Sequence, residues 1–175
     1  MTTVSIHELR MASTNVDTQE QQYSMQKNLE SFELSCHGKT ERGTICEYIV
    51  ARQLNQLGYD SEVTAANAKY DVVTRLPDND VRIEVKSSLL GKSNNYFVMG
   101  NIKPYLFDYL FFVFVHPTQG IVVRWTTKTE AYKVGRYLSD NLNGMRFGFR
   151  SDMTSCQGLK VWDVEDFPYE INIKS

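Results

Sequence analysis

The stretch YDVVTRLPDNDVRIEVKSS, Tyr70 to Ser88, alternates apolar and polar residues on both sides of a loop and therefore predicts a β-hairpin. The residues PDND, 77–80, form the expected loop, which places Leu76 opposite Val81. Because side chains alternate along a strand, one face of this hairpin is apolar and the other is charged. The charged face carries Asp71, Val73, Arg75, Arg82, Glu84 and Lys86.

The expected register brings three useful charges together. Asp71 faces Lys86 and lies diagonal to Glu84, at Cβ separations of roughly 5 and 7 Å. Mg²⁺ is typically held by one or two carboxylates and keeps several waters, which leaves room for a phosphate oxygen and an attacking water. The Lys86 ammonium can orient or deprotonate that water. The alternative is the solvated face of a half-buried hairpin, on which Asp and Glu pair with Lys.

The segment before the hairpin predicts an amphipathic helix over residues 40–57, ended by Gly58. Glu47 lies at the border of its apolar stripe, in the same row as Val50 and Leu54. This position predicts a carboxylate directed along the sheet toward the hairpin. A capping or salt-bridge role for Glu47 is the alternative.

Downstream of the hairpin, the chain predicts three strands and a helix over residues 126–138. The strands are YFVMG (96–100), YLFFVFV (109–115) and IVVRW (121–125). YLFFVFV is apolar throughout, which indicates burial on both faces and a central position in a mixed or partly parallel sheet. The tail GLKVWDVEDF can add a strand or pack as irregular structure. This order of elements predicts the α/β class, a sandwich with a mixed sheet.

Length and composition predict one globular domain, since the chain has 175 residues of which 42% are hydrophobic and 23% charged. Residues 1–35 are rich in Gln, Thr and Ser, and we expect a partly mobile tail and a helix there, with a single domain over 36–175. The longest apolar run is far shorter than the roughly 18 residues of a membrane span, and no signal-peptide pattern is present. A soluble, cytoplasmic protein without a membrane partner is expected.

The cysteines and the charge distribution carry weaker signals. Cys36, Cys46 and Cys156 include no close pair, which argues against a disulfide framework and a paired zinc site, and Cys46 is expected in the core. Between residues 69 and 160, Lys and Arg outnumber Asp and Glu by 13 to 8, whereas the rest of the chain carries 6 and 13. A basic middle is compatible with a phosphate-facing surface, although charge scattered over several faces gives the same count.

The helix with Glu47, then Tyr70-Asp71, then Glu84-Val85-Lys86 in the next strand, resembles the PD-(D/E)xK phosphodiesterase superfamily. This superfamily includes restriction enzymes, Holliday junction resolvases and some homing endonucleases, and the similarity is greatest to small homing endonucleases and resolvases. It covers about residues 39–128. It implies a restriction endonuclease-like core, in which helices flank a central mixed β-sheet. One departure is Tyr70, where the family name has proline.

The resemblance implies a role for each of these residues. Asp71 and Glu84 are the implied metal ligands, together with the main-chain carbonyl of Val85. Lys86 is implied to position or activate the water, and Glu47 to support the metal site directly or through water. The implied catalytic residues are Lys86, Asp71, Glu84 and Glu47. The expected cofactor is Mg²⁺, for which Mn²⁺ can substitute, and no organic cofactor is expected.

Six further residues are candidate DNA contacts. Two serines follow the lysine, at positions that often approach the substrate backbone in relatives. Two arginines flank the site on the charged face, and two lysines lie in the loops beyond it. For the four cations, solvated surface charge is the alternative. The residues are Ser87, Ser88, Arg75, Arg82, Lys92 and Lys103.

The expected function is a metal-dependent DNA endonuclease that hydrolyses phosphodiester bonds by in-line attack of a metal-activated water, on double-stranded DNA. One alternative is a non-catalytic DNA-binding or assembly module with a nuclease-like fold. Another is a structure-specific nuclease for branched DNA, or an RNA nuclease. DNA is the expected partner, and a homodimer fits cleavage of both strands, because one such site cuts one strand at a time.

Overall fold

The structure is a computed structural model that describes most of the chain beyond residue 30. The described residues are 31, 33–66, 68–90, 95–103, 106–116, 119–135, 144–153, 155–156 and 158–168. Within them no helix has the length and apolar character that crossing a bilayer requires.

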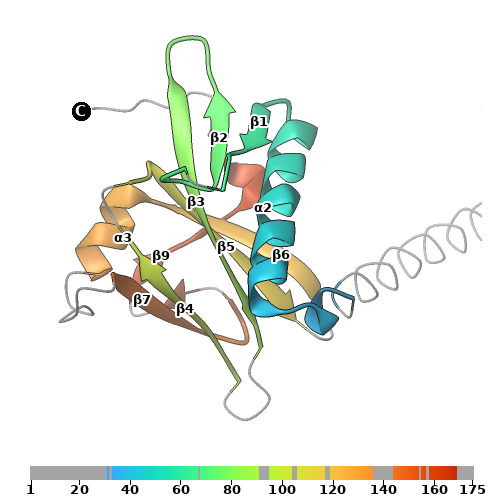
Figure 1. Ribbon diagram of the computed structural model, residues 1–175. Helices are drawn as coiled ribbons and strands as arrows, with labels where there is room; N and C mark the ends of the chain where they lie inside the picture. The colour runs from blue at the N-terminus through green and yellow to red at the C-terminus, as the bar shows by residue number, and fades with distance from the viewer. Residues whose placement is uncertain are drawn as a thin grey trace, which may run out of the picture.

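A six-stranded mixed sheet forms the centre of the molecule (Figure 1). Its strand order is β1-β2-β3-β5-β6-β10; β3 and β5 are parallel, and all other neighbours are antiparallel. The predicted α/β class and mixed sheet are therefore confirmed. The strands are β1 (Asp60–Val63), β2 (Val72–Arg75), β3 (Asp80–Leu89), β5 (Tyr109–His116), β6 (Gly120–Thr127) and β10 (Trp162–Asp163).

The predicted strand at residues 96–100 exists, but it lies outside the central sheet. β4 (Tyr96–Ile102) pairs with β7 (Met145–Arg150) in a separate two-stranded antiparallel sheet. Figure 1 shows this pair beside α3, below the central sheet. The remaining elements are the short pair β8 (Ser155–Cys156) and β9 (Leu159–Lys160), the helix α3 (Lys128–Gly135) and the 3-10 turn η1 (Val164–Asp166).

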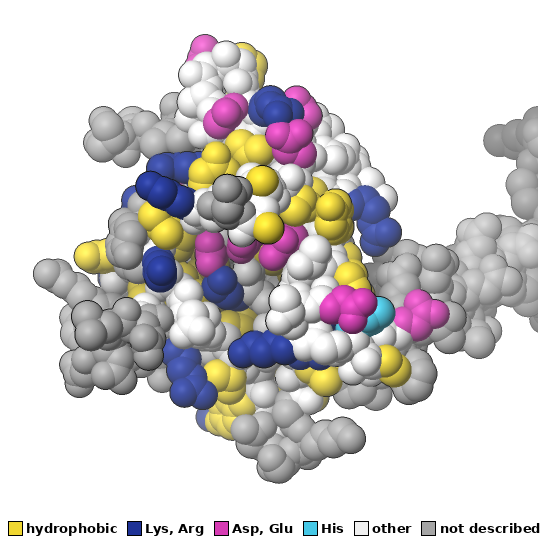
Figure 2. All heavy atoms as spheres, viewed as in Figure 1, with side chains coloured by type: hydrophobic (Ala, Val, Ile, Leu, Met, Phe, Trp, Pro, Cys, Tyr) yellow, Lys and Arg dark blue, Asp and Glu magenta, His cyan; other side chains and the backbone are white. Residues whose placement is uncertain are grey.

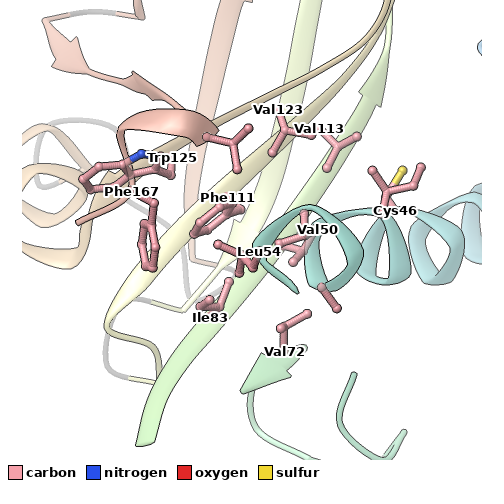
Figure 3. Close-up of a cluster of buried hydrophobic side chains, with 14 of the residues drawn as sticks. Cys46, Val50, Leu54, Val72, Ile83, Phe111, Val113, Val123, Trp125 and Phe167 are labelled. Atoms are coloured by element: carbon pink, nitrogen blue, oxygen red, sulfur yellow. The ribbon is translucent and has the colours of Figure 1, made fainter. Parts of the chain in front are cut away.

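One face of the central sheet is covered by α2 (Lys39–Gln56), close to the predicted helix. Cys46, Val50 and Leu54 are fully buried on its inner side and face the sheet (Figure 3). Cys46 is thus a core residue, as expected, and its burial raises the pKa of the thiol to about 11. The helix ends at Gln56 with Leu57 as its C-cap, and Gly58 follows with φ +94°, a conformation that glycine adopts without strain.

β5 is buried on both faces, which confirms its predicted central position. Its alternate residues Phe111 and Val113 belong to the core under α2. Phe112 and Phe114 belong to a second core, shared with β4 and β7 on the opposite face. β5 therefore joins the two halves of the sandwich.

The register of the β2–β3 hairpin differs from the prediction by two residues. Arg75 pairs with Asp80 and Thr74 with Val81, so the loop is Leu76–Asn79 and not 77–80. The Leu76 N–H donates to the Asn79 carbonyl at 3.1 Å, which continues the ladder up to the turn, and Pro77 occupies the second position of that turn, where proline is favoured. Because the shift is by an even number, every residue keeps its predicted face.

The helix predicted at residues 126–138 begins two residues later than expected. Thr126 and Thr127 complete β6, and the Thr127 hydroxyl accepts a hydrogen bond from the Glu130 N–H at 3.1 Å. Thr127 is thus the N-cap of α3, because its side chain satisfies a free N–H group of the first turn. Residues 136–138 of the predicted helix lie outside the described residues.

The short segment before α2 packs on the domain. Ser31 donates a hydrogen bond to the His116 carbonyl at 2.9 Å, and Leu34 is a buried member of the core under α2. The predicted tail and helix cover residues 1–35, of which residues 1–30 and 32 lie outside the described residues. Two residues of the predicted tail, Ser31 and Leu34, therefore pack against the rest of the structure.

Candidate active site

A cavity of about 670 Å³ lies where α2, β3, β4 and β7 converge. Glu47 reaches it from α2, Asp71 from the residue before β2, and Val85 and Lys86 from β3. In Figure 2, acidic side chains occupy a hollow near the centre of the visible face, with Lys and Arg side chains around it. Residues from three separate segments of the chain thus meet at one cavity.

The fourth predicted catalytic residue, Glu84, lies beside Lys86. Its Oε1 is 2.5 Å from Lys86 Nζ, and the two side chains are only 12% and 23% exposed. They share a face of β3 because they are two residues apart. Their ion pair fixes the lysine at the cavity wall.

Two hydrogen bonds to the backbone of β3 hold Asp71 in place. Its N–H donates to the Ile83 carbonyl at 3.0 Å, and its Oδ2 accepts from the Val85 N–H at 2.7 Å. In the observed register Asp71 extends β2 toward Glu84, and not toward Lys86 as predicted. Asp71 is therefore placed by backbone groups, independently of Lys86.

The pKa values of the two glutamates of the site are raised above their ordinary values. Burial raises the pKa of Glu84, and Asp71 raises it further, while Lys86 lowers it; the pKa stays above the ordinary value. Burial also raises the pKa of Glu47, with Asp71 and Glu84 adding to the increase and Lys86 opposing it. For both glutamates burial is the largest cause, so the anionic form is disfavoured at this site, and a bound cation would offset that cost.

The oxygen donors at the cavity fit a hard divalent cation. Within the described part of the chain, no three Asp, Glu, His or Cys side chains form a group that could hold a metal ion by themselves. Mg²⁺ does not require three, because it is commonly bound by one or two carboxylates and retains several waters. Glu47 and Asp71 line one cavity next to Val85, and that set satisfies this requirement.

The predicted arginine contacts are engaged within the protein. Arg75 pairs with Glu62, and its NH1 is 3.7 Å from Asp60. Arg82 binds Asp108 through two guanidinium nitrogens, at 2.7 and 3.0 Å. Both guanidinium charges already have carboxylate partners, so phosphate contact by either residue stays a prediction.

The other four predicted DNA contacts occupy different environments. Ser87 lines the cavity and hydrogen-bonds with Cys46. Ser88 is buried and accepts a hydrogen bond from the Val98 N–H at 3.1 Å, which connects β3 to β4. Lys103 is exposed, and its charge lowers the pKa of Glu84. Lys92 lies outside the described residues.

Sequence reasoning missed two cations of the cavity, Lys39 and Arg146. Lys39 lies eight residues before Glu47, at the start of the same helix. Arg146 belongs to MRFGFR, whose strict alternation of apolar and other residues is the pattern of a strand that presents its arginines outward. That alternation could have identified β7, although not its position beside the cavity.

The bond between Arg82 and Asp108 predicts an effect of pH on stability. Burial by itself raises the pKa of the Asp108 carboxyl, but hydrogen bonds from the Arg82 side chain and backbone outweigh it, so the pKa is below its ordinary value. A lowered pKa in the folded state stabilises the protein above the unfolded-state pKa, and that stability is lost as pH falls through the folded value. We expect Asp108→Asn to lower the free energy of unfolding by about 1–2 kcal/mol at pH 7, since Arg82 is partly exposed.

The measurement is urea denaturation at pH 7 and near pH 3, with Asp78→Asn in the exposed hairpin loop as the control. The difference in stability between the Asp108→Asn variant and the parent should shrink at the lower pH. A difference that is constant with pH would contradict the assigned ionic contribution.

Two solved structures resemble this structure. One is the bacterial homing endonuclease I-Ssp6803I, with a TM-score of 0.48 and 14% identity, covering 65% of this chain and 78% of that chain. The other is Hjc, a Holliday junction resolvase from the archaeal hyperthermophile Archaeoglobus fulgidus, with a TM-score of 0.39 and 13% identity, covering 64% and 86%. Both proteins belong to groups that the sequence resemblance names. No protein-family model and no curated protein sequence matches the chain.

Proposed function

We propose that this protein is a metal-dependent endonuclease that hydrolyses phosphodiester bonds of double-stranded DNA. The observation that carries this proposal is the meeting of Glu47, Asp71 and Lys86 at one cavity, with Glu84 paired to the lysine. On an ordinary solvated hairpin face, we would expect neither a partly buried ion pair such as Glu84–Lys86 nor a carboxylate from a helix, Glu47, beside it. A phosphodiesterase needs both oxygen donors and a cation beside an open space.

The proposed donors for the metal are the carboxylates of Asp71, Glu84 and Glu47 and the carbonyl of Val85, each acting directly or through a water that the ion retains. A divalent cation such as Mg²⁺ supplies charge neutralisation at the phosphate and a lowered pKa for water. The Val85 N–H donates to Asp71 Oδ2, which fixes the position of this carboxylate at the cavity. The ion pair with Lys86 fixes the Glu84 carboxylate beside the lysine.

Lys86 is proposed to orient the attacking water in line with the scissile bond. Its ammonium donates a hydrogen bond to the water oxygen and offsets the negative charge that develops on the phosphate. Glu84 holds the ammonium in place, because the two side chains are in direct contact and largely buried. The positioning therefore precedes substrate binding, which lowers the entropic cost of the reaction.

The charges around the cavity support a polyanionic substrate. Lys39 and Arg146 line the cavity together with Lys86, and Lys103 acts on Glu84 from nearby. Cations on several sides of a cavity can bind consecutive phosphates and fix the strand relative to the catalytic groups. Cutting both strands of a duplex calls for two such sites, so we propose that the active form on duplex DNA is a homodimer.

The test is cleavage of supercoiled plasmid DNA by the full chain with Mg²⁺ or Mn²⁺. We expect nicked and linear products with either ion and none after addition of EDTA, because without a metal the carboxylates repel the phosphate and nothing lowers the pKa of the attacking water. Discrete fragments from a linear genome would further indicate sequence specificity. If the folded protein is inert with both metals on duplex, branched and single-stranded DNA and on RNA, the proposal is wrong.

A further inference from the structure

The two-stranded sheet of β4 and β7 has two chemically different faces. Its inner residues, Phe97, Met99, Phe147 and Phe149, belong to the second core. On the outer face Tyr96 pairs with Arg150, and Val98 pairs with Gly148. Tyr96 and Val98 are 41% and 40% exposed. The outer face is defined here as Tyr96, Val98, Gly100, Arg146, Gly148 and Arg150.

The outer face is basic and without opposing charge. Neither strand contains Asp or Glu. Arg146 and Arg150 are exposed and have no ion-pair partner among the described residues, whereas Arg75, Arg82 and Arg124 are each paired with a carboxylate. Two uncompensated guanidinium groups on one small sheet attract a polyanion.

Two glycines, Gly100 and Gly148, leave the backbone at the centre of this face uncovered by side chains. Neither Gly100 nor Gly148 has a positive φ, so the backbone does not require glycine there. A Cβ at Gly148 would meet no described atom within 4 Å, and a Cβ at Gly100 would lie an ordinary 3.6 Å from the Arg146 side chain. Absence of side chains at such positions is expected where another molecule approaches the backbone closely.

The outer face runs directly into the candidate active site. Val98, Gly100 and Arg146 line the same cavity as Asp71 and Lys86. Figure 2 shows Lys and Arg side chains over the region where Figure 1 places β4 and β7. A strand of nucleic acid in the cavity would therefore continue onto this sheet.

We propose that the outer face of the β4–β7 sheet enters the major groove of duplex DNA next to the scissile phosphate. A two-stranded β-ribbon has the width that this groove admits. From Arg146 to Arg150 the face extends roughly 13 Å at about 3.3 Å per residue, which spans about four base pairs. Arg146, beside the cavity, binds phosphate, and Arg150 with Tyr96 at the far end contacts base edges. The identity of the duplex rests on the proposed nuclease function.

The same geometry separates duplex DNA from duplex RNA. The major groove of A-form RNA is deep and narrow, so a ribbon of this kind cannot reach its base edges. We therefore expect tighter binding to duplex DNA than to duplex RNA of the same sequence.

The experiment measures DNA binding without cleavage, by fluorescence anisotropy of a 30-base-pair duplex in EDTA at low salt. Arg146→Ala and Arg150→Ala should each weaken binding several-fold, and Gly148→Glu by about tenfold or more, because it places a bulky anion on the docking face. Gly148→Glu should melt at the temperature of the parent, since the added side chain has open space. Arg52→Ala, an exposed arginine on α2, is the control and should bind as the parent does.

Groove choice is tested by competition in the same assay. Methyl green, a major-groove ligand, should displace the protein, and netropsin, a minor-groove ligand, should not. Equal binding of the duplex RNA, displacement by netropsin alone, or parental affinity of all three sheet variants would overturn the inference.

This inference and the proposed nuclease function fail separately. If the parent cuts plasmid while the sheet variants bind as it does, the nuclease proposal stands and the groove contact is wrong. If the sheet variants lose affinity while the parent never cuts, the contact stands and the protein is a DNA-binding module.

Discussion

Lys86→Ala is expected to reduce the rate of DNA cleavage by about 100-fold or more, while DNA binding changes little. A positioned acid–base or electrostatic group typically contributes roughly 10²–10⁴-fold to rate, and Lys86 is the cation of the site that touches a carboxylate. The loss should therefore appear in the single-turnover rate constant with saturating enzyme, and not in the affinity measured in EDTA.

The matched control for this prediction is Lys133→Ala, which removes the same side chain from the exposed surface of α3. Circular dichroism and a melting curve check that both variants are folded. Removing Lys86 leaves the Glu84 carboxylate buried without its partner, so a modest loss of stability is expected as well. Cleavage by the folded Lys86→Ala protein at a rate within tenfold of the parent would remove Lys86 from the mechanism.

Phe112→Ala is expected to lower the free energy of unfolding by about 3–5 kcal/mol. The ring is fully buried, and its centroid lies 4.8 Å from that of Phe149 and 6.0 Å from that of Phe147, both in edge-on contact. Phe112 thus connects the central sheet to the β4–β7 sheet. Its truncation leaves a cavity between the two sheets and removes the contacts that the ring makes with both.

Urea denaturation measures this loss, with Tyr132→Ala on α3 as the control. Tyr132 is half exposed, and its truncation should change stability by no more than about 0.5 kcal/mol. A loss below about 1 kcal/mol for Phe112→Ala would mean that the two sheets are not packed through this ring. If the Phe112→Ala variant cleaves DNA more slowly than the parent at a temperature at which both are folded, the β4–β7 sheet also positions the substrate.

The sequence by itself determined the elements whose signals are local. The apolar stripe and Gly58 predicted α2 nearly to its ends, and the unbroken apolar run predicted a central β5. Alternation placed Asp71, Glu84 and Lys86 on one side of the hairpin, because the side-chain period of a strand is two residues. The two-residue error in the register left that side unchanged. The alternation of apolar and polar residues determines which face each residue is on, whereas the geometry of the turn determines which residues pair.

Only the tertiary structure decided what surrounds those residues. Nothing local in β4 indicates that it leaves the central sheet and pairs with β7, some forty residues later. That pairing supplies Arg146 and one wall of the cavity, while the packing of α2 supplies Glu47 and Lys39. Likewise, Arg82 looked free until the fold placed Asp108 beside it. Such contacts follow from the burial of complementary faces far apart in the chain, which a periodic pattern does not specify.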